Sequence, residues 1–205
     1  MAQKTAEFSI APAASTRFPR AALRRASGIC NACMGLSKLI ALQLAQEKQI
    51  PLLAYGWSPG QIPLPSALLT YTPSLVHTML RSTATLLQEL AGQDLEAYLP
   101  REQPLTAATA RELHSVSPLA FVDYDEHRVR QRICELGWQA PDDTDPNSSN
   151  CLLNAFASHV HRRQYGYHPY DKELATLVRK GYLTRDEAIR RLDAAPDSAL
   201  LASVE

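Results

Sequence analysis

The chain has 205 residues, and its 21 Lys and Arg residues balance its 21 Asp and Glu residues, giving a formal net charge of zero. This balance excludes the global basic field that nucleic-acid-binding proteins usually carry. Four cysteines are too few for a disulfide scaffold, and the sequence has neither a secretory signal nor a run of about 18 apolar residues. We therefore expect a cytoplasmic protein with reduced thiols and no membrane partner.

The apolar periodicity predicts helices separated by two short strands. Helices are expected at residues 33–49, 73–90, 123–136, 151–164, 173–180 and 184–192, with a further short helix at 105–113. The apolar runs 50–57 and 116–122 lack a helical period and predict buried strands of the parallel type. Residues 58–65 and 141–150 are rich in proline or turn-forming residues, so we expect them to be loops.

The alternation of helices with short apolar strands indicates an α/β fold. Because only two strands are convincing, we expect a partial parallel sheet flanked by helices rather than a complete one. Three parts are predicted along the chain. They are a flexible tail with a net charge of +4 at residues 1–28, an incomplete α/β domain at 29–165 and a helical C-terminal extension at 166–205. In the extension, Thr184 and Glu187 have the spacing of a capping box.

Cys30 and Cys33 form a C-x-x-C motif where a helix is expected to begin. The unpaired backbone N–H groups and the dipole at a helix start stabilise thiolates, which are good nucleophiles and soft-metal ligands. Two thiols that only pack at the helix start remain an alternative. Cys134 falls inside an amphipathic helix, where we expect it to lie in the core.

Cys151 lies at a second loop-to-helix junction, so it could converge with Cys30 and Cys33 at the strand ends. Three thiolates with a fourth position open would suit a [4Fe–4S] cluster that holds an external ligand. Zinc, bound by the C-x-x-C thiols and a histidine, is the alternative. His159 and His161 are two residues apart and would point to different faces of a helix, so we do not expect them to bind the same metal ion together.

The loop Gly56–Gln61 follows the first predicted strand directly. In open parallel sheets ligands bind beyond the carboxyl ends of the strands, and glycine allows the backbone to approach a ligand closely. Gly56 and Gln61 are therefore candidate ligand-binding residues, although an ordinary Pro-Gly turn would explain the same residues.

Two further segments have ambiguous patterns. Carboxylates and amides at residues 142–150 precede a predicted helix and suit either an anion or magnesium site or a solvated cap. Basic residues alternate with tyrosines at 159–170, which suits nucleic-acid stacking. A solvated helix end explains this second pattern better.

Three segments together resemble the PP-loop ATP pyrophosphatases, the adenine nucleotide alpha-hydrolase superfamily. Residues 29–61 are similar to the segment in which a C-x-x-C helix leads to an A-x-E-x-x-I-P motif and a strand that ends in glycine. Residues 115–143 are similar to a later R-P-L-type strand–helix segment. Residues 145–156 resemble the D-x-S-N loop of the tRNA lysidine and thiocytidine synthetases, and residues 177–192 are similar to N-acetyl sugar amidotransferases. The residues that carry the first two matches are Cys30, Cys33, Ala45, Glu47, Ile50, Pro51, Gly56, Pro118, Leu119, Val122 and Glu126.

The resemblance implies a Rossmann-like HUP fold and an adenylation reaction. ATP with magnesium would activate a substrate oxygen as its adenylate, and a nitrogen or sulfur nucleophile would then displace AMP. Cys30 and Cys33 would bear a persulfide or, with Cys151, ligate a [4Fe–4S] cluster. Gly56 and Gln61 would lie near the adenylate.

One defining motif of that superfamily is missing. The Ser-Gly-Gly-x-Asp-Ser loop that binds pyrophosphate is absent, because none of the eight glycines is followed by another. The chain therefore resembles only the C-terminal portion of such an enzyme, inactive alone and completed by another polypeptide or by homo-oligomerisation. A small-molecule substrate is favoured over tRNA because the chain is neutral. A non-enzymatic Fe–S or zinc accessory module and an inactive truncated remnant are the alternatives.

Overall fold

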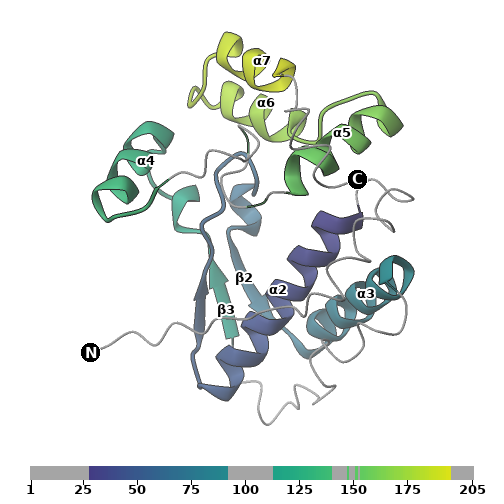
Figure 1. The fold of residues 1–205 in the computed structure, drawn as a ribbon. Helices are drawn as coiled ribbons and strands as arrows, with labels where there is room; N and C mark the ends of the chain where they lie inside the picture. Colours follow the sequence, from purple (N-terminus) through teal and green to yellow (C-terminus); the bar gives the residue numbers. More distant parts are fainter. Residues whose placement is uncertain (1–27, 92–112, 140–146, 148–150, 152, 195–205) are drawn as a thin grey trace.

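The computed structural model describes residues 28–91, 113–139, 147, 151 and 153–194, and the statements below concern these residues. Figure 1 shows two layers. The lower layer contains a small sheet with two helices beside it, and the upper layer contains four shorter helices. The chain is thus a mixed α/β protein, as the alternation of helices and strands predicts.

The sheet has three strands in the order β1-β3-β2. The strands β1 (Leu52–Ala54) and β3 (Leu113–Val116) pair in parallel, with Leu52 opposite His114. The strand β2 (Leu68–Tyr71) pairs with β3 in the antiparallel sense. The expectation of a purely parallel sheet is therefore wrong. The chain turns back through the proline-containing 3-10 helix η1 (Leu64–Ser66), so the next extended segment lies beside β3 in the opposite direction.

Two long helices cover one face of this sheet. They are α2 (Gly28–Glu47) and α3 (Pro73–Ala91), and the second confirms the predicted helix almost to the residue. Their apolar side chains form a core with the inner face of the sheet, consisting of Leu42, Ala45, Tyr71, Val76 and Leu113. Burying this apolar surface is the main contribution that holds the lower layer together.

Close contact between α2 and α3 depends on Gly35. A Cβ atom at this position would lie 2.5 Å from Oγ1 and 3.2 Å from Cγ2 of Thr83. Thr83 is itself buried in α3. The absence of a side chain at residue 35 thus sets how closely the two helices approach.

Two predicted boundaries are wrong for identifiable reasons. The helix α2 starts five residues earlier than expected, so Cys30 and Cys33 both lie inside its first two turns. The second predicted strand, 116–122, ends where it was expected to begin, because the 3-10 helix η3 (Pro118–Ala120) starts after Val116. Proline has no N–H group to donate to a neighbouring strand, which ends the pairing there.

The upper layer consists of α4 (Glu126–Glu135), α5 (Leu153–Tyr165), α6 (Asp171–Arg179) and α7 (Arg185–Asp193). These helices confirm the last four predicted helical segments. A second apolar cluster, separate from the first, joins α6 to α7 and contains Leu174, Leu177, Leu183 and Ala188. Thr184 caps α7 by accepting a hydrogen bond from the backbone N–H of Glu187 at 3.2 Å, which is half of the predicted capping box.

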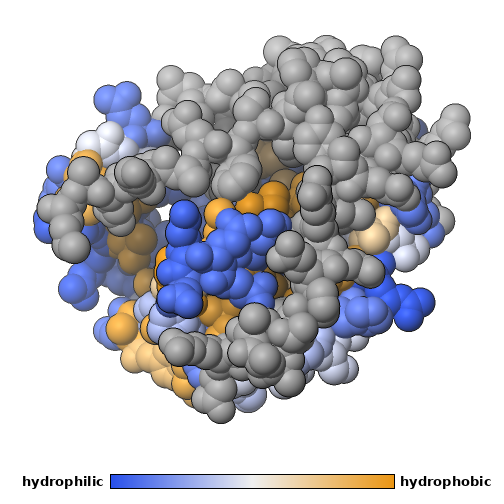
Figure 2. Space-filling view, turned by 90° about the horizontal axis from the view of Figure 1, so that it is seen from below, coloured by the Kyte–Doolittle hydropathy of each residue, from blue (hydrophilic) through white to orange (hydrophobic). Residues whose placement is uncertain are grey.

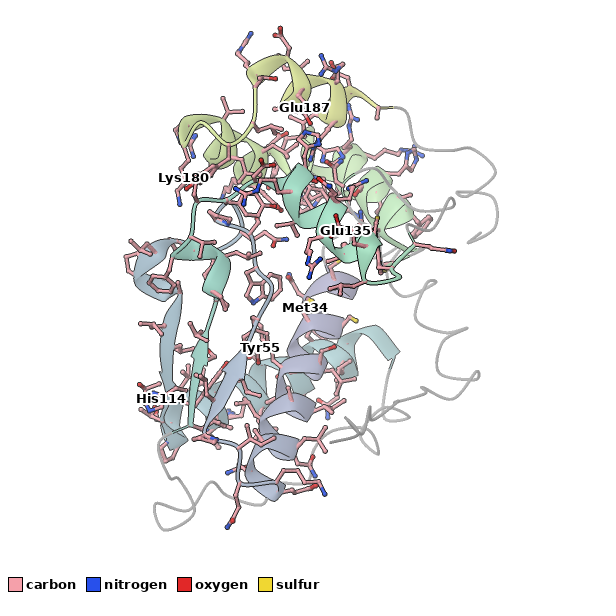
Figure 3. The ribbon with its side chains drawn as sticks, turned by 90° about the vertical axis from the view of Figure 1, so that its left-hand side faces the viewer. Met34, Tyr55, His114, Glu135, Lys180 and Glu187 are labelled. Atoms are coloured by element: carbon pink, nitrogen blue, oxygen red, sulfur yellow. The ribbon has the colours of Figure 1, made fainter. Side chains whose placement is uncertain are left out.

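The sheet's other face is open among the described residues. Leu52 is 50% exposed and Leu68 is 60% exposed. Figure 3 shows His114 on the face turned away from α2, and Figure 2 shows hydrophobic surface on the side where the sheet lies in Figure 1. Sheets with parallel strands are normally covered on both faces, whereas the described residues cover only one face of this sheet.

Several predictions fall outside the described residues. These are the basic tail up to residue 27, most of the short helix at 105–113, and the loop at 141–150 apart from Asn147. No helix within the described ranges is both long enough and apolar enough to span a membrane.

Candidate functional site

A polar cavity lies where the carboxyl ends of β1 and β3 meet the upper layer. It has a volume of about 180 Å³. Because the two strands are parallel neighbours, the segments that follow them emerge at the same edge of the sheet, and both line the cavity. Its walls are formed by Gly56, Ser58, Gln61, Tyr124, Glu126, Arg130, Asn147, Tyr170, Glu173, Leu174, Leu177 and Arg191.

The loop after β1 is fixed by its own hydrogen bonds. The backbone N–H of Ser58 donates to Oε1 of Gln61 at 2.9 Å, and the backbone N–H of Gln61 donates to Oγ of Ser58 at 3.2 Å. Ser58 is buried, whereas Gln61 is exposed. These reciprocal bonds make the segment a rigid turn, so Gly56 and Gln61 reach the cavity from a preformed loop.

The same loop is docked on α6. The hydroxyl of Ser58 donates to Oε1 of Glu173 at 3.1 Å, and Nζ of Lys180 donates to the carbonyl of Pro59 at 3.2 Å. A Cβ atom on Gly60 would lie 2.8 Å from the backbone carbonyl oxygen of Glu173. The close approach of loop and helix therefore requires glycine at position 60.

Glu173 is the most perturbed carboxylate of the site. Burial raises its pKa above the ordinary value, although hydrogen bonds from Ser58 and Gln61 oppose the increase. The nearby charge of Glu126 raises this pKa further, and Arg191 lowers it. The loop and α6 thus hold a partly desolvated carboxyl group at the cavity wall.

Arg191 also lines the cavity and is hydrogen-bonded to the carboxylates of Glu126 and Glu187. Its Nη1 donates to Glu126 at 2.9 Å and its Nη2 donates to Glu187 at 2.6 Å. Burial alone would lower the pKa of this guanidinium, but the hydrogen bonds to Glu126 and Glu187 and their negative charges together raise it. The bond to Glu126 ties α7 to the first turn of α4.

Tyr124 lies beside Arg191. Burial raises the pKa of its phenol, and the charges of Glu126 and Glu173 raise it further. Its ring contacts that of Tyr182 edge to face at 5.7 Å between centroids. Tyr124 therefore stays neutral and provides a hydroxyl at the cavity wall.

The three candidate thiols lie at the same end of the molecule. Burial raises the pKa of Cys30 and of Cys33, and the negative charge of Cys151 is the next cause for both residues. Both C-x-x-C thiols are solvent-exposed by surface area, and Cys151 is half-buried. The start of α2 and the segment before α5 thus bring three sulfur atoms within electrostatic range of one another.

α2 also connects the thiols to the loop after β1. Nζ of Lys38 lies 5.4 Å from the centroid of the Trp57 ring, a cation–π contact. Lys38 follows Cys33 by five residues, which is about 7.5 Å along the helix axis at 1.5 Å per residue. The helix that carries the thiols therefore contacts the loop after β1 through Lys38 and Trp57. Figure 3 shows Met34, next to Cys33, at the end of α2 that meets the upper layer.

No group of three or more His, Cys, Asp or Glu side chains within the described ranges is arranged to hold a metal ion. A [4Fe–4S] cluster or a zinc ion on Cys30, Cys33 and Cys151 stays a prediction. The rings of His161 and Tyr165 are in contact, with 4.7 Å between their centroids.

One expectation about a single residue changes with the structure. Cys134 is exposed on α4 rather than buried in the core, so that expectation is wrong. None of the residues of α4 is buried. Asn147, the described residue of the segment 142–150, lines the cavity and donates to the backbone carbonyl of Arg191 at 3.3 Å.

Sequence reasoning missed Glu173 and Arg191, which line the cavity, and Glu187, which pairs with Arg191. Glu173, Glu187 and Arg191 occur in short amphipathic helices, where charged residues usually face solvent. The contact between Ser58 and Glu173 joins residues 115 positions apart, and that between Glu126 and Arg191 joins residues 65 apart. No local pattern reveals such pairs.

No protein-family model, curated protein or solved structure matches this chain.

Proposed function

We propose that this chain is the cysteine-bearing C-terminal part of an ATP-dependent adenylating amidotransferase or sulfurtransferase of the PP-loop type. One observation carries the proposal. The thiol-bearing helix α2 contacts the loop after β1 through Lys38 and Trp57, and this loop lies at the carboxyl edge of a parallel strand pair. Ligands of open α/β sheets bind at this edge. The Rossmann-like HUP type of fold is part of the proposal.

The roles of the residues follow from their positions. ATP, when bound, supplies activation of a substrate oxygen as its adenylate. Gly56 and Gln61 lie beside the adenylate, and in sulfur transfer a persulfide borne by Cys30 or Cys33 would attack the adenylated carbon, forming the C–S bond as the bond to AMP breaks. The cavity of about 180 Å³ is smaller than the roughly 300–1,000 Å³ of usual ligand pockets. It therefore admits part of a nucleotide at most, and the pyrophosphate is left to another polypeptide.

The partner supplies what this chain lacks. Its Ser-Gly-Gly-x-Asp-Ser loop binds the pyrophosphate with magnesium, and its strands extend the half-covered sheet. Two copies of this chain would both lack that loop, so a different polypeptide is favoured over a homo-oligomer. A small-molecule acceptor is favoured over tRNA because the chain is neutral.

Pyrophosphate release tests the split enzyme. We expect none from ATP with this chain alone, and release when a polypeptide with the pyrophosphate loop is added. Cys30→Ser and Cys33→Ser should each reduce group transfer at least tenfold, whereas the exposed Cys134→Ser control should leave it unchanged. Pyrophosphate release by the chain alone would show that the split-enzyme proposal is wrong.

Iron and sulfide analysis of anaerobically purified protein separates the enzyme from an accessory metal module. An enzyme that uses the thiols directly remains active when it contains neither element. Stoichiometric iron and sulfide without pyrophosphate release in the reconstituted mixture would support the accessory module instead.

A further inference from the structure

Lys38 is a half-buried cation on α2 that has an aromatic partner but no carboxylate partner. Its Nζ lies 5.4 Å from the centroid of the Trp57 ring, and it forms no ion pair within the described part of the chain. The other charged residue of α2, Glu47, follows nine residues later, which is about 13.5 Å along the helix axis. Residues 49–76, which include the loop after β1, contain no charged residue. Neither the helix nor the loop therefore supplies a counter-ion for Lys38.

The cations that line the cavity are, by contrast, balanced by carboxylates. Arg130 and Arg191 share the lining with Glu126 and Glu173. Arg191 donates to Glu126 at 2.9 Å, and Arg130 approaches the same carboxylate at 3.7 Å. An anionic group inside the cavity would therefore meet no unpaired positive charge. At this edge of the sheet, the ammonium of Lys38 is the better partner for an anion.

Gly56 leaves a path from the cavity toward Lys38. It lines the cavity and directly precedes Trp57, whose ring Lys38 contacts. Gly56 is exposed, and a Cβ atom at this position would meet nothing within 4 Å. Figure 3 shows Tyr55, the residue before Gly56, between the strands and α2, so the chain enters this loop on the side of the helix that carries Lys38. A ligand that begins in the cavity can thus extend over Gly56 to the ammonium.

We propose that Lys38 binds the phosphoryl group of an adenine nucleotide where the nucleotide leaves the cavity, with the Trp57 ring holding the ammonium in place. The inference rests on the proposed function, in which this nucleotide is the adenylate. When the nitrogen or sulfur nucleophile attacks the adenylated carbon, the bond from that carbon to the phosphate oxygen breaks, and its electron pair stays on AMP. The ammonium of Lys38 stabilises the negative charge that develops on this oxygen.

Fluorescence of Trp57 in the full chain, without a partner, tests the phosphoryl site. The chain has two tryptophans, so Trp138→Phe leaves Trp57 as the reporter. AMP is the ligand, and adenosine, inorganic phosphate and sodium chloride at equal ionic strength are the comparisons. We expect a saturable change with AMP, weaker binding of adenosine and phosphate, and no change with sodium chloride. Absence of a saturable change with AMP, or binding of adenosine or phosphate as tight as that of AMP, would overturn the proposal.

Variants of Lys38 separate phosphate binding from a structural role. Lys38→Met keeps an unbranched side chain against the Trp57 ring and removes the charge, so AMP binding should weaken at least about tenfold while adenosine binding stays as in wild type. Lys38→Arg should retain most of the AMP affinity. Lys48→Met, at an exposed lysine just after α2, is the matched control and should bind AMP like the wild type. If Lys38→Met does not fold, Lys38→Gln provides the same comparison.

Two results with these variants would contradict the role of Lys38. Wild-type affinity for AMP in the variant without the charge would show that the ammonium does not bind the phosphate. An equal loss of AMP and adenosine binding would show that the substitution only disturbs the loop.

The reconstituted reaction distinguishes failure of this inference from failure of the proposed function. With the polypeptide that carries the pyrophosphate loop, Lys38→Met should slow group transfer at least about tenfold. Pyrophosphate release by the wild-type mixture together with an unchanged transfer rate in Lys38→Met would overturn the role of Lys38 and leave the proposed function standing. AMP binding that depends on Lys38, without pyrophosphate release by the mixture, would support the phosphoryl site and contradict the proposed function.

Discussion

At the scale of single residues, the thiols show how burial and neighbouring charge act together. Cys30 and Cys33 lie at the start of a helix, where the dipole favours thiolates, yet burial and Cys151 raise the pKa of both. Such thiols are less reactive at neutral pH than a helix start alone would make them. A positive partner or substrate beside them would increase their reactivity.

Removing the Cys151 thiol should therefore activate the C-x-x-C pair. We expect Cys151→Ser to lower the pKa of Cys30 and Cys33, because a nearby like charge disappears while burial remains. The pH dependence of iodoacetamide alkylation, followed for each cysteine by mass spectrometry, measures this. A Cys134→Ser variant controls for the loss of a thiol elsewhere, and unchanged profiles in Cys151→Ser would mean that the three thiols do not interact.

Glu173 links the site to stability. Its pKa is raised above the ordinary 4.5 in the folded chain, so the stability that it contributes is present below that pH and is lost as the pH rises through the raised value. The neutral variant Glu173→Gln should not show this loss. Urea unfolding at pH 4 and pH 7 should show the variant gaining stability relative to wild type at the higher pH. A relative gain by wild type would contradict the burial penalty.

At the scale of elements, two glycines determine how neighbouring segments meet. Gly35 allows α2 to approach α3, and Gly60 allows the cavity loop to approach α6. At both positions an added Cβ would come within 3.0 Å of another element. The lower layer and the loop that lines the cavity thus each depend on a residue without a side chain.

Substitution of Gly35 tests the helix contact. Gly35→Ala should destabilise the fold by about 1–3 kcal/mol, because the new methyl group meets the buried Thr83 side chain. Thr83→Ala in the same chain should recover part of this loss. Gly56→Ala is the control, since a Cβ there meets nothing within 4 Å. Urea denaturation measures all four proteins, and equal loss from the Gly35 and Gly56 substitutions would refute the steric account.

Asp125 is the N-cap of α4, and the next residue is Glu126, whose carboxylate lines the cavity. Oδ1 of Asp125 accepts from the backbone N–H groups of His127 and Arg128 at 2.9 and 3.1 Å. Asp125→Ala should cost about 1 kcal/mol of stability, whereas Asp125→Ser should retain most of it. Thermal unfolding compares the two variants, and indistinguishable curves for Ala and Ser would argue against the capping role.

At the scale of the whole molecule, the described residues cover only one face of the sheet. One face packs on α2 and α3, and the other exposes Leu52 and Leu68 among the described residues. An open apolar face and free strand edges favour association with other chains. This is the physical basis for expecting either a partner or self-association.

A charge on the open face should reduce self-association without harming the fold. Leu68→Lys should change the free energy of unfolding by no more than about 0.5 kcal/mol, because Leu68 is 60% exposed. It should also lower the apparent mass at high protein concentration in size-exclusion chromatography with light scattering. Gln43→Lys adds the same charge at an exposed position on α2 and should leave the mass as in wild type. A large loss of stability in Leu68→Lys would show that this face is covered.

The sequence by itself determined the described helices apart from the start of α2, the first strand and the loop after it, because hydrophobic periodicity and proline positions act over a few residues. Helix α3 and the cap at Thr184 follow from such local signals. The antiparallel strand Leu68–Tyr71 did not follow, because its apolar and polar residues do not alternate clearly and its pairing depends on β3.

Only the tertiary structure decided the chemistry of the cavity. Glu173 and Arg191 are ordinary charged residues of amphipathic helices until α6 and α7 pack over the carboxyl ends of β1 and β3. Packing then brings Ser58 to Glu173 and Glu126 to Arg191, across 115 and 65 positions of sequence. The pKa of the Glu173 carboxyl group depends on burial and on these distant partners, and no local pattern contains either of them.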